Sequence, residues 1–178
     1  MALGKPAEQS STYEESSWPD GSFLAAMGVD GIIEVQNFVH NKFDNFQKTN
    51  SGGNQWWKVN LGPGKTFVIT KIIIYNRDNT LDQAEIRDRL NGAVVKIFET
   101  GNTEAKWTSP EINGNDNDGV IIFDIISENV KGNEVKVELN TSYLHMAEVE
   151  VMGYEDTSIT FSNAGGGKKH LRLVLLIY

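Results

Sequence analysis

Two arginines stand at the two ends of one polar segment of the sequence. Arg77 follows the apolar run Ile72–Tyr75, and Arg89 stands immediately before LNGAVV, where the chain becomes apolar again. If each apolar run is a strand, the segment between them is a loop with both guanidinium groups at its mouth. A guanidinium offers a planar fork of hydrogen-bond donors, which suits vicinal hydroxyls or a ring oxygen. The segment therefore predicts a site for a small polar ligand.

Carboxylates accompany these arginines. Asp78 and Asp82 lie in the same segment, where they can orient a guanidinium and accept a proton from a ligand hydroxyl. The alternative is that the arginines form surface salt bridges with Asp78, Asp82, Glu85 or Asp88, which would add little stability. Both interpretations stay open at this point.

Aromatic residues in polar surroundings are the second group of candidates, because a flat ring can pack on the apolar face of a sugar. The candidates on expected loops are Tyr13, Trp18, Phe43 and Phe46. Phe43 and Phe46 are interpreted either as buried loop anchors or as exposed binding residues. Trp56 and Trp57 are expected to be structural, one ring in the core and the other beneath a loop.

The elements that must position these residues are mainly strands. Short β-branched runs, several alternating apolar with polar residues, predict strands at Phe67–Tyr75, Ala93–Phe98, Val120–Ile126, Glu134–Leu139 and Ala147–Tyr154. Turn clusters rich in Gly and Asn separate them. The one helix-like stretch, Leu81–Leu90, predicts a turn or two inside a loop. The pattern predicts an all-β sandwich or jelly roll.

The composition excludes several classes of function. The chain of 178 residues has a net charge of −8, so a phosphate backbone would repel it and nucleic acid is not an expected partner. It has no cysteine, no apolar run long enough to span a bilayer, and no signal-peptide pattern after Met1. No nucleophile, zinc or phosphate-loop motif is present, which predicts that the protein is not an enzyme.

The composition changes after Glu155, which predicts one domain over residues 1–155 and a linker with an apolar tail over residues 156–178. The tail ends in LVLLIY. We weigh three interpretations of it: an extra edge strand packed on the sandwich, an interaction segment, and an end without a biological role. Burial as a strand is favoured, because an uncovered apolar edge promotes aggregation.

Five segments, in this order, carry a resemblance to a known family: ALGKPAEQSSTY at Ala2–Tyr13, VDG at Val29–Gly31, WWKVNLG at Trp56–Gly62, the stretch from Tyr75 to Ile97, and YLHMAEVEVMGYE at Tyr143–Glu155. Together they resemble the discoidin-like jelly roll, also called the coagulation-factor C-type or galactose-binding-like fold, and within it the F-type lectins and related carbohydrate-binding modules. The resemblance implies a β-sandwich with its ligand site on loops.

The resemblance also implies which residues bind. Arg77 and Arg89 match the positions of the basic residues that bind sugar in F-type lectins, which implies a non-catalytic module for a galactose- or fucose-class glycan. Lys48 stands where the family commonly has a His, and Asn79 stands where it has an Asp. His40 is a further candidate from the loop before Lys48.

A structural calcium site is also implied by the family. Hard cations of this kind take six or more oxygen ligands. Glu148 matches the family's acidic ligand, and Ala147 would supply a carbonyl. The facing loop would supply side chains from Asp30, Asn37 and Thr49 or Ser51. The alternative is that Asp30 and Glu148 only cap turns.

Two other functions remain open: a lipid- or protein-adhesion domain using Phe43 and Phe46, and a binding appendage of a larger enzyme. Glycans are the expected partners, membrane binding is not expected, and self-association stays open. The compartment is left open by the sequence, while the resemblance implies an extracellular or secreted protein.

Overall fold

Nearly all regular structure in the described part of the chain is β. The computed structural model describes residues 1–14, 21–33, 46–77, 85–162 and 168–174. Within these ranges the strands are accompanied by four short 3₁₀ helices, so the predicted all-β class is confirmed. None of the described helices is long and apolar enough to cross a membrane.

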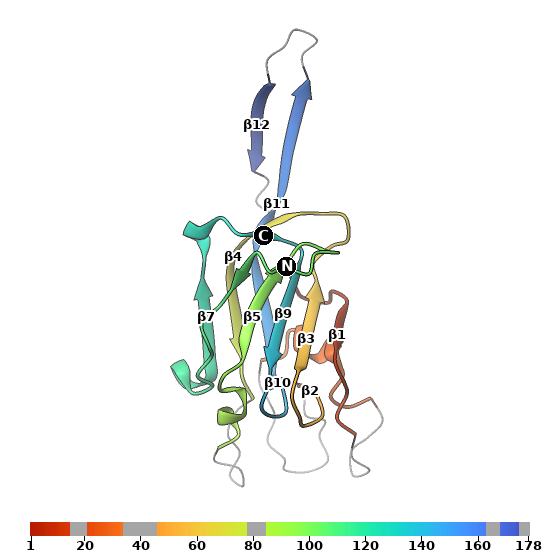
Figure 1. The fold of residues 1–178 in the computed structure, drawn as a ribbon, viewed down its shortest axis with the longest axis vertical. Coiled ribbons are helices and arrows are strands. Elements are labelled where there is room, and N and C mark those ends of the chain that lie inside the picture. The colour runs from red at the N-terminus through yellow and green to blue at the C-terminus, as the bar shows by residue number, and fades with distance from the viewer. Residues whose placement is uncertain (15–20, 34–45, 78–84, 163–167, 175–178) are drawn as a thin grey trace.

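The first sheet is antiparallel, with strand order β1-β3-β9-β5-β6 (Figure 1). Its strands are β1 (Ala7–Gln9), β3 (Gln55–Asn60), β9 (Glu134–Leu139), β5 (Val94–Phe98) and β6 (Trp107–Thr108). Along the central strand β9, Val135, Val137 and Leu139 are buried and the residues between them are partly exposed. This period of two places one face of the strand in the core.

The second sheet has the order β12-β11-β4-β7, with β8 also paired to β4. Its strands are β12 (Lys168–Val174), β11 (Glu148–Ser162), β4 (Phe67–Tyr75), β7 (Val120–Asp124) and β8 (Lys131–Gly132). A separate antiparallel pair joins β2 (Gln47–Lys48) to β10 (His145–Met146). The 3₁₀ helices are η1 (Ala25–Val29), η2 (Arg87–Leu90), η3 (Asp116–Gly119) and η4 (Ile126–Glu128).

The core contains Trp57, as expected, but Trp56 does not lie where the sequence suggested. The Trp57 ring is fully buried, and its indole nitrogen donates to the Ala25 carbonyl at 2.8 Å. Trp56 is partly exposed, and its ring lies 5.7 Å and 5.3 Å from the ammonium groups of Lys58 and Lys136. Because successive strand residues point to opposite faces, Trp56 belongs to the outer face of the sheet, and its expected place beneath a loop is wrong.

The predicted strands match the observed ones closely. Phe67–Tyr75 and Glu134–Leu139 are strands with those bounds, and Ala93–Phe98 begins one residue later, at Val94. The strand predicted at Val120–Ile126 ends at Asp124, because the chain turns into η4. Of the helix-like stretch Leu81–Leu90, the described part contains the single turn η2.

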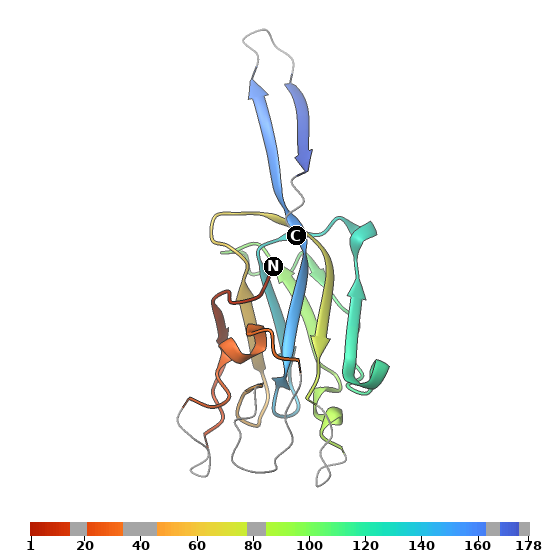
Figure 2. The same cartoon turned by 180° about the vertical axis from the view of Figure 1, so that it is seen from behind.

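The strand β11 continues past Glu155. It pairs with β4 from Glu148 to Glu155, and from Asp156 to Ser162 it pairs with β12 in a hairpin. Figures 1 and 2 show this hairpin projecting beyond the sandwich. The described part of the tail is thus a strand, but its partner is the extension of β11 and not the body of the sandwich. The division at residue 155 stays a prediction.

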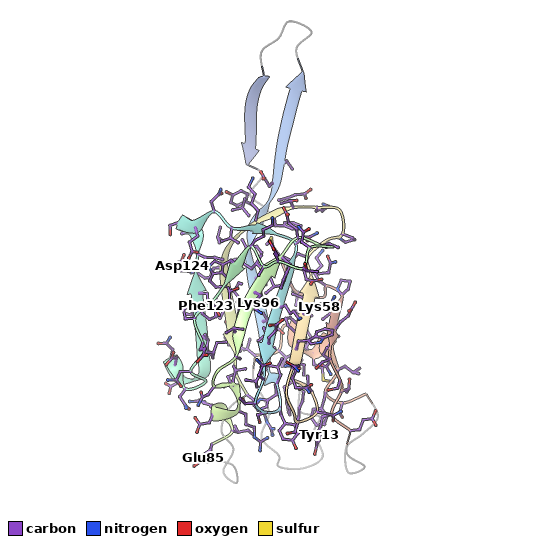
Figure 3. The ribbon with its side chains drawn as sticks, in the orientation of Figure 1. Tyr13, Lys58, Glu85, Lys96, Phe123 and Asp124 are labelled. Atoms are coloured by element: carbon purple, nitrogen blue, oxygen red, sulfur yellow. The ribbon has the colours of Figure 1, made fainter. Side chains whose placement is uncertain are left out.

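The sandwich has two distinct ends. Tyr75, the last residue of β4, pairs with Glu148, the first residue of β11, so the segment after β4 emerges at the end opposite the hairpin. Figure 3 shows Tyr13 and Glu85 at that end. We call it the loop end, and we call the other the hairpin end.

Candidate functional site

The side chain of Asn76 holds the loop end together. Its amide nitrogen donates to the carbonyls of Arg87 and Gly114, each at 3.0 Å, and its oxygen accepts from the Arg77 backbone at 2.8 Å. Gly114 is needed because a Cβ there would lie 2.0 Å from the Arg87 carbonyl oxygen. Asn76 thereby ties the end of β4 to η2 and to the loop before η3.

Arg77 is positioned by the hydrogen bonds of Asn76, which we call the Asn76 clasp, and by one aromatic ring. Its guanidinium carbon lies 4.3 Å from the centroid of Phe46, and the residue is 3% exposed. Phe46 is 1% exposed and packs on Phe23, with ring centroids 5.1 Å apart. Phe46 is therefore a buried anchor, and its alternative role as an exposed binding residue is wrong. Phe43 lies outside the described residues.

Lys48 is surrounded by three aromatic rings. Its ammonium nitrogen lies 3.4 Å from the centroid of Tyr13, 4.7 Å from that of Tyr143 and 5.5 Å from that of Phe23. Cation–π contacts are worth about 2 kcal/mol or more when desolvated, and Lys48 is 8% exposed. These contacts stabilise the ammonium group away from bulk water.

We call Tyr13, Phe23 and Tyr143 the aromatic cage of Lys48, and Tyr143 links this cage to Arg89. The Arg89 guanidinium carbon lies 5.5 Å from the same Tyr143 ring, and Arg89, on η2, is partly exposed. Lys48 and Arg89 come from positions 41 residues apart, yet they share one ring. The structure therefore brings together the cationic candidates from two segments of the sequence.

His145 lies among all three cations. Its ring is fully buried, pairs in register with Lys48, and packs edge-on against Phe46 at 6.3 Å. Burial lowers the pKa of His145 well below its ordinary value, and the charges of Arg77, Arg89 and Lys48 lower it further. The imidazole is neutral at pH 7 and adds no fourth charge. Neither ring nitrogen has a hydrogen-bond partner among the described residues.

Phe23 adopts a strained backbone conformation that completes the cage. Its φ is +63°, which is rare for a bulky residue. In this conformation its carbonyl accepts from the Lys48 backbone at 3.2 Å and from the Gln9 amide at 2.9 Å. Strain of this kind persists where the surroundings fix it, and it is common at functional sites. Sequence reasoning missed Phe23, His145 and Asn76, since none carries a motif that marks the role.

Four of the predicted sugar-binding residues, Asp78, Asn79, Asp82 and His40, lie outside the described residues. Their roles stay predictions. The aromatic candidate Trp18 is outside as well, whereas Tyr13 contacts Lys48 and packs edge-to-face on Tyr143, with centroids 5.7 Å apart.

The two acidic candidates for the calcium site lie close together. Glu148 is 2% exposed and accepts a hydrogen bond from the Gly31 backbone at 3.1 Å, while Asp30 accepts from the Ile32 backbone at 2.9 Å. Burial raises the pKa of Glu148 to about 7, and the Asp30 carboxylate acts in the same direction. Burial also raises the pKa of Asp30. A divalent cation would offset both effects.

The other expected calcium ligands fit less fully. The Thr49 hydroxyl donates to the Asn50 carbonyl and accepts from the Leu144 backbone, each at 3.0 Å. Ser51 is exposed, Ala147, whose carbonyl was the expected ligand, is fully buried, and Asn37 lies outside the described residues. Within the described ranges no three His, Asp or Glu side chains form a metal-binding group. The hydrogen bonds of Asp30 and Glu148 match the turn-capping alternative, and calcium stays a prediction.

No protein-family model and no curated protein matches the sequence. Solved structures do match. A fucose-binding module of Streptococcus pneumoniae, SpX-3, is 28% identical with a TM-score of 0.65, and the match covers 86% of this chain and 96% of that one. The lectin domain of lectinolysin, complexed with Lewis b antigen, is 27% identical with a TM-score of 0.65 over 85% of this chain and 94% of that one.

An F-lectin from the serum of striped bass, Morone saxatilis, is also similar. It is 25% identical with a TM-score of 0.65, and the match covers 87% of this chain and 48% of that lectin. These similarities, together with the two antiparallel sheets, confirm the expected architecture. The chain is a discoidin-like β-sandwich jelly roll that resembles the F-type lectins and fucose-binding modules.

Proposed function

We propose that this protein is a non-catalytic carbohydrate-binding module that takes a neutral, galactose- or fucose-class glycan at the loop end. The observation that carries the proposal is the gathering of three cations on adjoining rings: Lys48 and Arg89 share the Tyr143 ring, and Arg77 lies on Phe46, against which His145 packs. Three cations from two segments of the chain place hydrogen-bond donors at one end of the sandwich, and sugar hydroxyls and ring oxygens are acceptors for them.

The surroundings of each cation indicate its role in binding the sugar. Arg77 is the most buried of the three and is held on one face by Phe46, and we assign it the innermost hydrogen bonds to the ligand. Arg89 is partly exposed and donates to the ligand from the η2 side. Lys48 supports the site through its rings and supplies a donor where the family commonly has a histidine.

Tyr143 and Tyr13 offer the apolar part of the site. Both are partly exposed, and their rings are fixed by the Lys48 ammonium and by each other. A pyranose has one apolar face, which packs on such a ring while its hydroxyls reach the cations. The fucose-binding modules and the Lewis b complex among the similar structures support this choice of sugar class.

The test is glycan binding by Arg77→Ala and Arg89→Ala, on an array and by calorimetry. Hydrogen bonds to a charged group contribute about 1.5–3 kcal/mol, so we expect each variant to lose at least about tenfold in affinity. Lys96→Ala is the matched control, because Lys96 lies on the outer face of β5 in an ion pair with Glu138. It should bind as the original protein does.

Melting temperatures separate a lost contact from a lost fold. Arg89→Ala should melt near the original protein, since Arg89 is partly exposed on a single helical turn. Unchanged affinity in both arginine variants would defeat the assignment of the site. Absence of binding to every neutral glycan by the original protein would defeat the function itself.

A further inference from the structure

An open cavity of about 410 Å³, which we call the hairpin-end cavity, lies away from the loop-end site. Its lining comes from the β5–β6 connection and from the segment between η4 and β8: Glu99, Lys106 and Trp107 on one side, and Glu128, Asn129 and Lys131 on the other. Small-molecule sites have volumes of about 300–1,000 Å³, so the cavity is large enough for a monosaccharide or disaccharide.

The position follows from the strand directions. β7 and β11 both pair antiparallel with β4, so the end of β7 lies at the same end of the sandwich as the hairpin. Figure 3 shows Phe123 and Asp124, near the end of β7, well separated from Tyr13 and Glu85. The cavity is thus at the opposite end of the molecule from Arg77 and Arg89.

Both walls of the cavity are fixed by the protein itself. The Trp107 ring, from one sheet, packs edge-to-face on Phe123 of the other, with centroids 5.8 Å apart. A Cβ on Gly132 would lie 2.5 Å from the Ile97 side chain, so β8 closely abuts β5. The Val130 carbonyl accepts from the Ile69 backbone at 2.9 Å. A ligand would therefore meet a formed cavity and would not have to order it.

The charges at the cavity disfavour an anionic ligand. Its charged lining residues are two lysines and two glutamates, so their formal charges cancel. Lys106 pairs with Glu99 at 3.1 Å, and Lys131 pairs with Asp156. With Asp156 counted, three carboxylates face two lysines, so no lysine is left over to hold an anion, while ammonium, carboxylate and amide groups supply both donors and acceptors. A polyhydroxylated molecule uses that mixture.

The indole of Trp107 and the amide of Asn129 complete the match. Trp107 is partly buried at the sheet edge and offers an aromatic surface to the cavity. Asn129 is exposed and has φ +50°, a left-handed conformation that directly follows η4. We propose that this cavity is a second saccharide site, which takes one or two units of a neutral sugar and works independently of Arg77 and Arg89.

Nuclear magnetic resonance of the full chain, labelled with ¹⁵N, tests the proposal. The chain has four tryptophans, so its indole N–H signals are few, and Trp107→Phe assigns the one of interest. The probes are free galactose, fucose, glucose, N-acetylglucosamine and cellobiose, each titrated into the high millimolar range. We expect at least one of them to shift the Trp107 indole signal saturably.

Two variants make the result specific. The double variant Arg77→Ala with Arg89→Ala should show the same Trp107 shift with the same affinity, whether or not the loop end binds sugar. Asn129→Gly keeps the backbone conformation, because glycine tolerates positive φ, and it removes the amide. It should weaken the Trp107 titration at least fivefold and leave glycan binding at the loop end unchanged.

Three results would overturn the second site. They are the absence of a saturable Trp107 shift with every probe, loss of the shift in the double arginine variant, and an Asn129→Gly titration identical to that of the original chain. The first and third results concern the cavity alone, so the second site can fail while binding at the loop end stands.

Discussion

Two buried ionisable residues at the loop end respond to pH in opposite directions. Glu148 has a pKa raised to about 7 by burial, so its folded form holds a proton that the unfolded chain has lost. His145 has a lowered pKa, so its imidazole stays neutral in the folded protein at pH values just below 6.5, where the unfolded chain binds a proton. Their effects on stability therefore oppose each other between about pH 4.5 and pH 6.5, and from there to about pH 7 only Glu148 still changes the stability.

Glu148→Gln should isolate the carboxyl from the imidazole. The stability contributed by the protonated carboxyl is complete below about pH 4.5 and is lost as the pH rises to about 7, a loss on the order of 3 kcal/mol at most. The melting temperature of Glu148→Gln, relative to that of the original protein, should therefore increase as the pH rises from 5 to 8. Parallel melting curves across that range would contradict the raised pKa.

The same pair of proteins tests calcium at pH 8. A cation bound to Glu148 and Asp30 should raise the melting temperature of the original protein by mass action, and Glu148→Gln should lose that rise. A chelator should reverse it. If neither protein responds to calcium or chelator, Asp30 and Glu148 act as turn caps, through their bonds to the backbone of Ile32 and Gly31.

At the residue scale, the sequence identified cations better than it identified the rings around them. Lys48, Arg77 and Arg89 were predicted from type and position, and the structure places them on the adjoining rings of Tyr143 and Phe46. Phe46 was left between two interpretations, because a phenylalanine among polar residues has the same local pattern whether it is an anchor or exposed. The positive φ of Phe23 is imposed by contacts with residues distant in sequence, so no local pattern marks it.

Among the elements, the segment after β4 is organised by one side chain. Asn76→Ala should remove its bonds to the carbonyls of Arg87 and Gly114 and leave those groups without that donor. Each unsatisfied buried group costs about 1–3 kcal/mol, so the melting temperature should fall, and glycan affinity should fall with it because η2 carries Arg89. Calorimetry and thermal melts measure the two effects.

Asn102→Ala is the control for this variant. Asn102 is exposed, and its amide donates to Glu99 at 3.1 Å on the surface. It should leave both stability and loop-end binding unchanged. If Asn76→Ala binds glycan as well as Asn102→Ala does, the clasp does not position the site.

Strand bounds were predictable where a strand alternates or is strongly β-branched. The bounds of β4 and β9 follow from such runs, FVITKIIIY and EVKVEL. The far end of β11 was not predictable, because Asp156–Ser162 lacks a strong β-branched run and is extended by pairing with its hairpin partner β12. The strands β2 and β10 were not predictable either, because each has two residues and is defined by its pairing with the other. Pairing between distant segments overrides local propensity in such short strands.

At the scale of the whole molecule, net charge and buried aromatics oppose binding to anionic lipid. With a net charge of −8 and Phe46 buried, we expect no co-sedimentation with phosphatidylserine vesicles at physiological salt. A chain ending at Glu155 should be measured beside the full chain, so that any lipid binding by the apolar tail LVLLIY is recognised. Robust binding by the shorter chain, lost in Phe43→Ser, would favour the lipid-adhesion alternative.

The separation of the loop end from the hairpin end decides how a single molecule could meet a sugar-coated surface. Sites that face opposite ways cannot both reach the same flat layer, so they would not add avidity on one surface. They could instead bridge two surfaces, and a monomer could then cross-link glycan-bearing particles without any self-association. Agglutination by a monomeric sample would depend on the hairpin-end cavity as much as on Arg77 and Arg89.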